Sequence, residues 1–249
     1  MKRLATTLLT IGTLAIASSA FADGTYQTLP FTQNWTNIAL ITVSDDWSGV
    51  PGILGLRGDG LVAATGVDPQ TVTADDAVPV VDVNANNANP NTFVTGGVTE
   101  FDALADPVVA LQGSGTADAP YLQFHINAAG KQNILFGCSL RDVDGSADNA
   151  VQPIAVQYRV GTTGSWTNLP AGFVADASTG PSLATAVTAV FVALPAAADG
   201  QPQLQIRVIT TDAVGSDEWI GVDNITVEGT DIPTATTAPS WGNLKALYR

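Results

Sequence analysis

Residues 142–149 carry the residue types that bind a hard cation. They read DVDGSADN, with Asp142, Asp144 and Asp148 placed around an Asp-Gly turn. Calcium takes several oxygen ligands and tolerates irregular loops, so a turn here could bring the three carboxylates to one side. The stretch lacks the closing glutamate of an EF-hand loop, and a turn joining two strands explains the same residues. We therefore predict a structural calcium site, with a plain turn as the alternative.

A fourth candidate ligand, Asp223, lies within a predicted strand, WIGVDNITV. Strict alternation places it on the same face as Trp219, Ile225 and Val227. An unpaired carboxylate among apolar side chains costs several kcal/mol or takes up a proton. We expect Asp223 to meet a metal ion, an arginine or backbone N–H donors. A β-bulge at Gly221 that turns the carboxylate outward is the alternative.

The residues of the common hydrolytic sites are scarce. His125 is the only histidine, and alternation places it on the solvent-facing side of its strand. A Ser-His-Asp triad needs that histidine beside an activated serine, and no G-x-S-x-G turn is present. A catalytic zinc site usually takes several His or Cys ligands. A glycosidase-type carboxylate pair stays open because aspartate is plentiful, but no catalytic residue is predicted and a non-catalytic role is favoured.

Two tryptophans are the candidate ligand-binding residues. Trp47 and Trp166 both stand in turn-rich segments. A shallow aromatic face around either of them would indicate a binding module, whereas a cleft lined by pairs of aspartates would indicate a hydrolase.

Short alternating runs predict the elements that must position these residues. Apolar side chains alternate with polar ones in several segments separated by Gly, Asp and Asn turns, which is typical of half-buried antiparallel strands. In QLQIRVI, for example, Gln205 and Arg207 are expected to be exposed. Many strands at this spacing predict an all-β antiparallel sandwich with jelly-roll-like connections. The main strands are expected at 121–127, 134–141, 154–160, 203–209 and 219–228.

The segment from residue 45 to about residue 97 differs from the rest because it is rich in Gly, Pro, Asp and Asn. Short strands are expected at residues 53–56 and 93–95. The remainder is predicted to form long ordered loops, because Trp47, Ile53 and Phe93 need burial. Cys138 is the only cysteine, so no disulfide can form within the chain, and its place in an alternating run predicts a core residue.

The two ends have compositions of their own. Residues 1–22 combine a basic start, a short apolar run and an A-x-A ending, the pattern of a secretory signal peptide cleaved after Ala22. The sandwich domain is expected over 23–230, a Pro/Thr-rich linker over 231–239 and a short tail over 240–249. No later segment has the length and apolarity of a membrane span. The chain is therefore predicted to be secreted or attached to the cell surface.

The chain is strongly acidic, with 23 Asp and Glu against 9 Lys and Arg. Two of the basic residues, Lys2 and Arg3, belong to the predicted signal peptide. Such a surface repels phosphate backbones and anionic lipid headgroups. Direct nucleic-acid binding is therefore not expected, whereas cations and uncharged ligands are compatible with this charge.

Several long motifs resemble the β-rich accessory region that precedes the catalytic domain of some bacterial secreted nucleases and phosphatases. They include FTQNW, DDWSGVPGILGLRGDG, LRDVDGSADNAVQPIAVQYRVG and DEWIGVDNITVEG. The catalytic domain of those enzymes is absent here. The last strand also resembles that of lectin-like and carbohydrate-binding sandwiches, which implies a structural calcium at Asp223 near residues 31–35. The ending SWGNLKALYR is similar to export or attachment tails of bacterial proteins.

These observations favour a non-catalytic secreted module that binds a glycan, a cell surface or a partner protein, with calcium as a structural ion. The alternative is an extracellular hydrolase that acts on a phosphoester or a glycan through a carboxylate site that the motifs do not identify.

Overall fold

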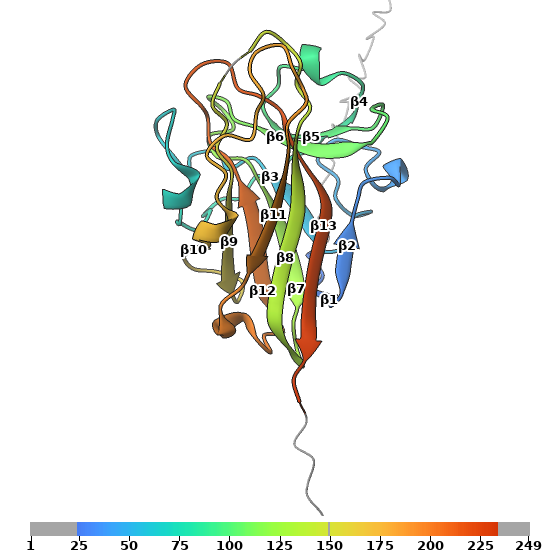
Figure 1. The fold of residues 1–249 in the computed structure, drawn as a ribbon, viewed down its shortest axis with the longest axis vertical. Helices are drawn as coiled ribbons and strands as arrows, with labels where there is room; N and C mark the ends of the chain where they lie inside the picture. The colour runs from blue at the N-terminus through green and yellow to red at the C-terminus, as the bar shows by residue number, and fades with distance from the viewer. Residues whose placement is uncertain (1–23, 149, 234–249) are drawn as a thin grey trace, which may run out of the picture.

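The protein is a sandwich of two β-sheets, shown by the computed structural model in Figure 1, which describes residues 24–148 and 150–233. The first sheet has the strand order β1-β7-β12-β9-β10, and β3 also pairs with β7. Its strands are β1 (Gln27–Thr28), β3 (Ile53–Leu56), β7 (Tyr121–Asn127), β9 (Ala155–Val160), β10 (Thr167–Asn168) and β12 (Leu204–Ile209).

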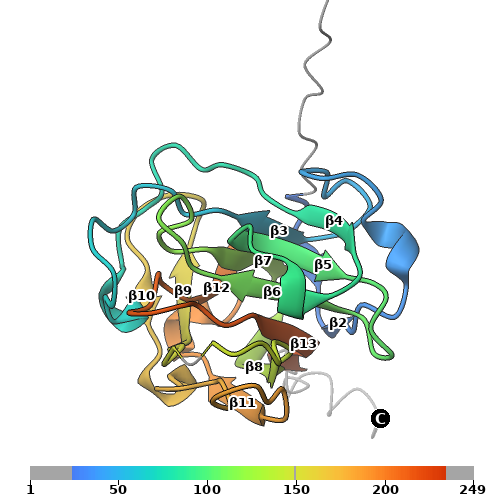
Figure 2. The same ribbon diagram turned by 90° about the horizontal axis from the view of Figure 1, so that it is seen from above.

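The second sheet has the order β11-β8-β13-β6-β5-β4, and β2 pairs with β13. From above, this sheet bends from β11 and β8 through β13 and β6 to β5 and β4 (Figure 2). Its strands are β2 (Phe31–Gln33), β4 (Asn84–Asn87), β5 (Gly97–Phe101), β6 (Val108–Gln112), β8 (Lys131–Asp142), β11 (Val187–Ala193) and β13 (Ile220–Asp231).

Helical structure in the described residues consists of short 3-10 turns within the connections. They are η1 (Ile38–Leu40), η2 (Pro69–Thr71), η3 (Pro90–Thr92), η4 (Pro170–Gly172) and η5 (Ala196–Ala198). No helix in the described ranges is long and apolar enough to cross a lipid bilayer. The all-β sandwich is therefore confirmed. The sheets are mixed, however, because β1 pairs with β7 and β4 pairs with β5 in parallel.

The core lies between the sheets and follows the predicted alternation. In the first sheet, Ile206 of β12 lies opposite Phe124 of β7 and Tyr158 of β9, so their side chains share one face. Phe124 reaches the second sheet, where its ring centroid lies 5.5 Å from that of Phe136. Cys138 is buried in the same cluster as a free thiol. The prediction of a core cysteine is confirmed.

The five main predicted strands are all present, with ends shifted by a few residues, and residues 53–56 form β3 as predicted. The strand expected at residues 93–95 is wrong. Asn89 caps η3 by accepting a hydrogen bond from the amide of Asn91 at 3.0 Å, and Pro90 occupies its first turn. The helical turn continues into an irregular stretch, and the next strand begins only at Gly97.

The second face of the first sheet is buried, which corrects the expected exposure of Gln205, Arg207 and His125. Gln205 is 3% exposed, Arg207 0% and His125 5%. The segment 67–82 lies over this face and is bonded to it. Gln157 donates to the carbonyl oxygen of Pro69 at 3.0 Å, and Arg207 donates to that of Val72. The polar alternation therefore marks an interface between the sheet and a long loop.

The predicted signal peptide and the tail at 240–249 lie outside the described residues. The linker was predicted to begin at residue 231, but β13 continues through Asp231, so the predicted boundary is one residue too early. The rest of that predicted linker, from residue 234 onward, also lies outside the described residues.

Candidate functional site

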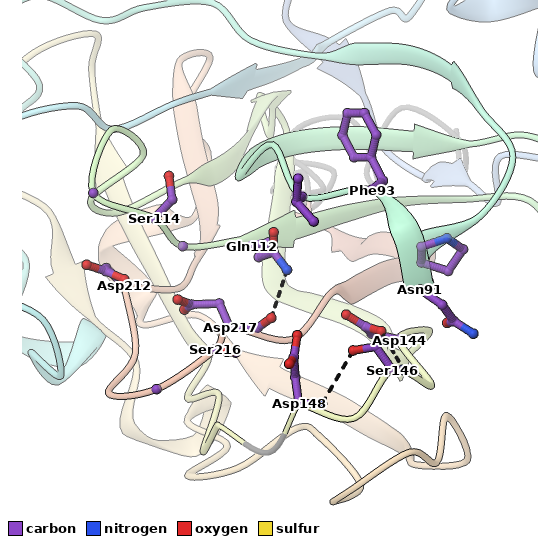
Figure 3. A pocket seen from close by; sticks show the side chains of 15 residues that line it. Asn91, Phe93, Gln112, Ser114, Asp144, Ser146, Asp148, Asp212, Ser216 and Asp217 are labelled. Carbon is purple, nitrogen blue, oxygen red and sulfur yellow. Dashed lines mark hydrogen bonds between the residues drawn. The ribbon is translucent and has the colours of Figure 1, made fainter.

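A cavity of about 520 Å³ lies at the end of the sandwich where β8 finishes and β13 begins. The loops after β8 and before β13 meet there, at the upper end of the molecule in Figure 1. Figure 3 shows that its lining side chains are mostly oxygen-bearing and come from segments far apart in the sequence. They include Asn91, Phe93, Gln112, Ser114, Asp144, Ser146, Asp148, Asp212, Ser216 and Asp217.

The loop after β8 supplies two of the predicted carboxylates to this cavity. Asp144 accepts a hydrogen bond from the amide of Ser146 at 2.9 Å, which bends the chain so that Asp148 returns to the same wall. Asp142 does not line the cavity. Its two oxygens accept the amides of Asp144 at 3.2 Å and Thr179 at 2.5 Å. The Asp-Gly turn thus brings Asp144 and Asp148 together at the cavity, as predicted, but not Asp142, which accepts backbone amides instead.

The loop before β13 supplies two more carboxylates, Asp212 and Asp217, which the sequence did not single out. The amide of Ala213 donates to Oδ1 of Asp217 at 2.8 Å, and Gln112 donates to its carbonyl oxygen at 2.8 Å. Burial raises the pKa of Asp217 to about 7; the Ala213 amide opposes that rise, and the nearby Asp212 carboxylate adds to it. The cavity is therefore lined by two pairs of acids, 144 with 148 and 212 with 217.

Glu218 directly follows the lining residue Asp217 without lining the cavity itself, and the sequence did not single it out either. It is 1% exposed, and its Oε1 atom is buried without a hydrogen-bond partner. Burial raises the pKa of Glu218 to about 8, and the carboxylates of Asp144 and Asp142 raise it further. The only signal in the sequence was the acidic pair directly before Trp219, and nothing in it indicated burial.

Asp223 is buried, as predicted, at 1% exposure, but it does not share a face with Ile225 and Val227. It lies opposite Ser139, whereas Thr226 lies opposite Gly137, so β13 has one extra residue between these pairs. Asn224 absorbs the irregularity with a φ of 48°. The expectation that Asp223 faces the core with Ile225 and Val227 is therefore wrong. A β-bulge is present, as in the alternative, but it lies at Asn224 rather than at Gly221.

The partner of Asp223 is an arginine on the outer face of the second sheet. Ser139 alternates with the core residues Cys138 and Leu140, so Asp223 faces away from the core. There Nη1 of Arg141 lies 2.8 Å from Oδ2 of Asp223 and 3.0 Å from Oδ2 of Asp106. The amide of Asn224 also donates to Asp223 at 2.6 Å. Two of the three partner types predicted for this carboxylate are thus present.

Neither predicted ligand-binding tryptophan presents a ring to solvent. Trp47 is 0% exposed and donates to the carbonyl oxygen of Asp82 at 3.1 Å. Trp166 is 3% exposed, and the guanidinium groups of Arg159 and Arg207 lie over its ring at 4.3 and 4.4 Å from the centroid. The expected exposed aromatic face is therefore not met at either position, and both rings pack internally.

In the part of the chain that the structure describes, no three Asp, Glu, His or Cys side chains are arranged to enclose a metal ion. Any cation at the cavity would take the remainder of its ligands from carbonyl groups, hydroxyl groups or water, as calcium commonly does.

No family model and no curated protein matches the chain. Among solved structures, it is similar to a family 28 carbohydrate-binding module specific for non-crystalline cellulose, at 16% identity over 59% of this chain and 98% of that one, with a TM-score of 0.36. A family 61 module in complex with β-1,4-galactotriose matches at 10% identity over 51% and 72%, with a TM-score of 0.32.

An apo cyclase from Fischerella sp. matches at 16% identity over 74% of this chain and 85% of that one, with a TM-score of 0.37. These identities and superpositions are too low to assign a ligand or a reaction to this chain.

Proposed function

We propose that this chain is a secreted β-sandwich module that binds a glycan in the cavity between the loops after β8 and before β13. The observation that carries the proposal is the lining itself. Carboxylates accept hydrogen bonds, and the amides of Asn91 and Gln112 and the hydroxyl of Ser146 both donate and accept them. A sugar presents neutral hydroxyl groups that match such a set, and a volume of about 520 Å³ is within the usual range for small-ligand sites.

Phe93 supports a sugar over a small ion as the main occupant of the cavity. Phe93 belongs to the lining, and its ring packs against Trp219, at 5.9 Å between ring centroids, and against Phe101, at 6.3 Å. A fixed apolar surface beside polar groups suits a ligand that has both C–H and O–H faces. The acidic charge of the chain argues against nucleic acid and anionic membranes.

The test is a glycan array probed with the exported protein, followed by calorimetry on the best glycan. Asp212→Asn keeps the size of a lining side chain and removes its charge, so we expect a clear loss of affinity. Glu228→Gln makes the same kind of change at an exposed position of β13 and should leave affinity unchanged. Absence of binding across the array, or equal affinity for both variants, would contradict the proposal.

An extracellular hydrolase is the second candidate, because a cleft lined by pairs of aspartates was the feature expected of a hydrolase and the cavity has two such pairs. Asp212 and Asp217 line the same wall, which is the arrangement expected of a carboxylate site. Assays for released reducing ends and released phosphate distinguish the two candidates. Turnover that disappears in Asp212→Asn would establish the hydrolase, whereas binding without turnover supports the module.

A further inference from the structure

Glu218 is a buried carboxylate that the protein itself does not neutralise. It is 1% exposed and its Oε1 atom has no hydrogen-bond partner. The side-chain amide of Gln152, which contacts the backbone of Glu218, is already used by other groups. Gln152 accepts the amide of Glu218 on its oxygen and donates from Nε2 to Thr210 at 2.6 Å and to the carbonyl oxygen of Thr211 at 3.0 Å. Burying a carboxylate without a partner costs several kcal/mol or forces it to take up a proton, so a cation bound at this position would stabilise the fold.

The surroundings of Glu218 are negative. The carboxylates of Asp144, Asp142, Asp148 and Asp176 all act on it electrostatically. Within residues 24–148 and 150–233 the chain forms five ion pairs, and none of them includes Glu218 or any of these four acids. The arginines and the lysine of those pairs are thus used elsewhere, and no ion pair of the described residues compensates the charge of Glu218.

The neighbouring acids are also held in place by the backbone. The amide of Ser146 fixes Asp144 at 2.9 Å, and the amides of Gln152 and Ser178 fix Asp176 at 3.3 and 3.0 Å. Carboxylates that are oriented before a ligand arrives lose little freedom when it binds. A hard divalent cation is the ligand that such oxygens bind best.

We propose that Glu218 and Asp144 hold a calcium ion behind the wall of the cavity, with carbonyl, hydroxyl and water oxygens completing its shell. Calcium suits the site better than magnesium because it accepts irregular geometry and many oxygen ligands, whereas magnesium demands a near-ideal octahedron. The ion would tie the loop after β8 to the loop before β13. It would therefore hold together the two segments that form most of the cavity.

The experiment is thermal unfolding of the exported chain at pH 7.5 in calcium, in magnesium and in a calcium chelator, with calorimetry to count the ions. At a hundredfold excess over the dissociation constant, calcium should raise the melting temperature by about 5–10 °C. Magnesium should raise it much less. One ion per chain is expected. A wild-type protein whose melting temperature is the same in calcium and in chelator would overturn the proposal.

Glu218→Gln should abolish the calcium-dependent rise in melting temperature. It should also change the melting temperature in opposite directions in chelator and in calcium. In chelator this variant should melt above the wild type, because a neutral glutamine needs neither a buried charge nor the uptake of a proton at this position. In calcium it should melt below the wild type. Glu100→Gln is the matched control, because Glu100 is also buried, at 4% exposure, but accepts a hydrogen bond from the amide of Asn86 at 3.0 Å. It should keep the full calcium shift.

A calcium shift that persists in Glu218→Gln would contradict the assignment. If that variant does not fold, Asp144→Asn serves in its place, and retention of the one-ion stoichiometry in Asp144→Asn would contradict it equally. These measurements need no glycan. Calcium binding can therefore be established even if no glycan binds, and glycan binding can be established even if calcium does not bind.

Discussion

Asp223 and Glu218 are both buried to 1% exposure, one within β13 and the other just before it, yet their electrostatic surroundings are opposite. Asp223 has a cation of the chain itself, Arg141 at 2.8 Å. Glu218 has four acidic neighbours and an oxygen without a hydrogen-bond partner. The first is a completed structural pair. The second has no such partner in its ion pairs or hydrogen bonds, and we propose that an external cation completes it.

The largest effect is expected when Asp223 loses its cation. Arg141→Ala leaves a buried carboxylate without its charge partner, which typically costs about 3–5 kcal/mol. Urea unfolding should show this loss equally with and without calcium. A loss of stability that appears only in chelator would place the ion at Asp223. It would contradict the conclusion that Arg141 alone supplies the charge partner of Asp223.

Glu100 provides the next largest effect, because it is buried like Glu218 but is hydrogen-bonded. Burial raises the pKa of Glu100 to about 7 from its ordinary 4.5. The folded state therefore binds the proton more tightly than the unfolded chain does, and stability falls as pH rises from about 4.5 to about 7.

Glu100→Gln removes this loss. It should increase the free energy of unfolding by an amount on the order of 2–3 kcal/mol at pH 8, and by nearly nothing at pH 4. Denaturant unfolding at the two pH values checks this, and equal effects at both would contradict the raised pKa.

A smaller effect is expected for Asp223→Ala. This change frees Arg141, but that guanidinium keeps Asp106, whose carboxylate lies at 3.0 Å and whose carbonyl oxygen lies at 3.2 Å. The loss should be about 1–3 kcal/mol, for hydrogen-bonding groups left unpaired. The double variant with Arg141→Ala should be more stable than Arg141→Ala alone, because it no longer buries a lone charge. A double variant that is less stable would show that the two residues do not act as a pair.

The smallest effect belongs to a pair at the surface. Lys131 lies 2.6 Å from Asp231, whose side chain is 85% exposed. Lys131→Ala should change stability by no more than about 1 kcal/mol, and the change should shrink further at high salt. A loss of stability comparable with that of Arg141→Ala would show that burial does not determine how much these ion pairs contribute to the free energy of unfolding.

The alternation of apolar residues was sufficient to predict the sandwich and its main strands. It could not predict what covers the other face of a strand. The run YLQFHIN is correctly identified as a strand, but His125 is buried because of contacts that include Tyr26, whose ring lies 5.3 Å away. Such contacts join residues far apart in the sequence, and a local pattern does not contain them.

The candidate site shows the same limit more strongly. The acids at 142, 144 and 148 were predicted from their spacing around a turn, which is a local property. Asp212, Asp217 and Glu218 were missed because their relation to that turn exists only once β8 and β13 pair, with Ile220 opposite Asp142. The face of Asp223 was mistaken because Asn224 adopts a positive φ, which breaks the alternation.

The segment 67–82 has the composition of a mobile loop, yet side chains of β9 and β12 and the backbone amide of Trp166 bond it to the sheet. The amide of Trp166 donates to the carbonyl oxygen of Thr73 at 2.8 Å, and Gln157 and Arg207 hold Pro69 and Val72. Its opening therefore requires the release of the strands' own polar side chains.

We expect the amides of this segment to exchange with deuterium on a timescale set by that release rather than by free fluctuation. Gln157→Ala removes one of these hydrogen bonds. It should speed deuterium exchange in segment 67–82 while the amides of the underlying strands stay protected. The loop therefore forms a third layer over the first sheet. Its resistance to opening depends on hydrogen bonds from side chains of the strands that it covers.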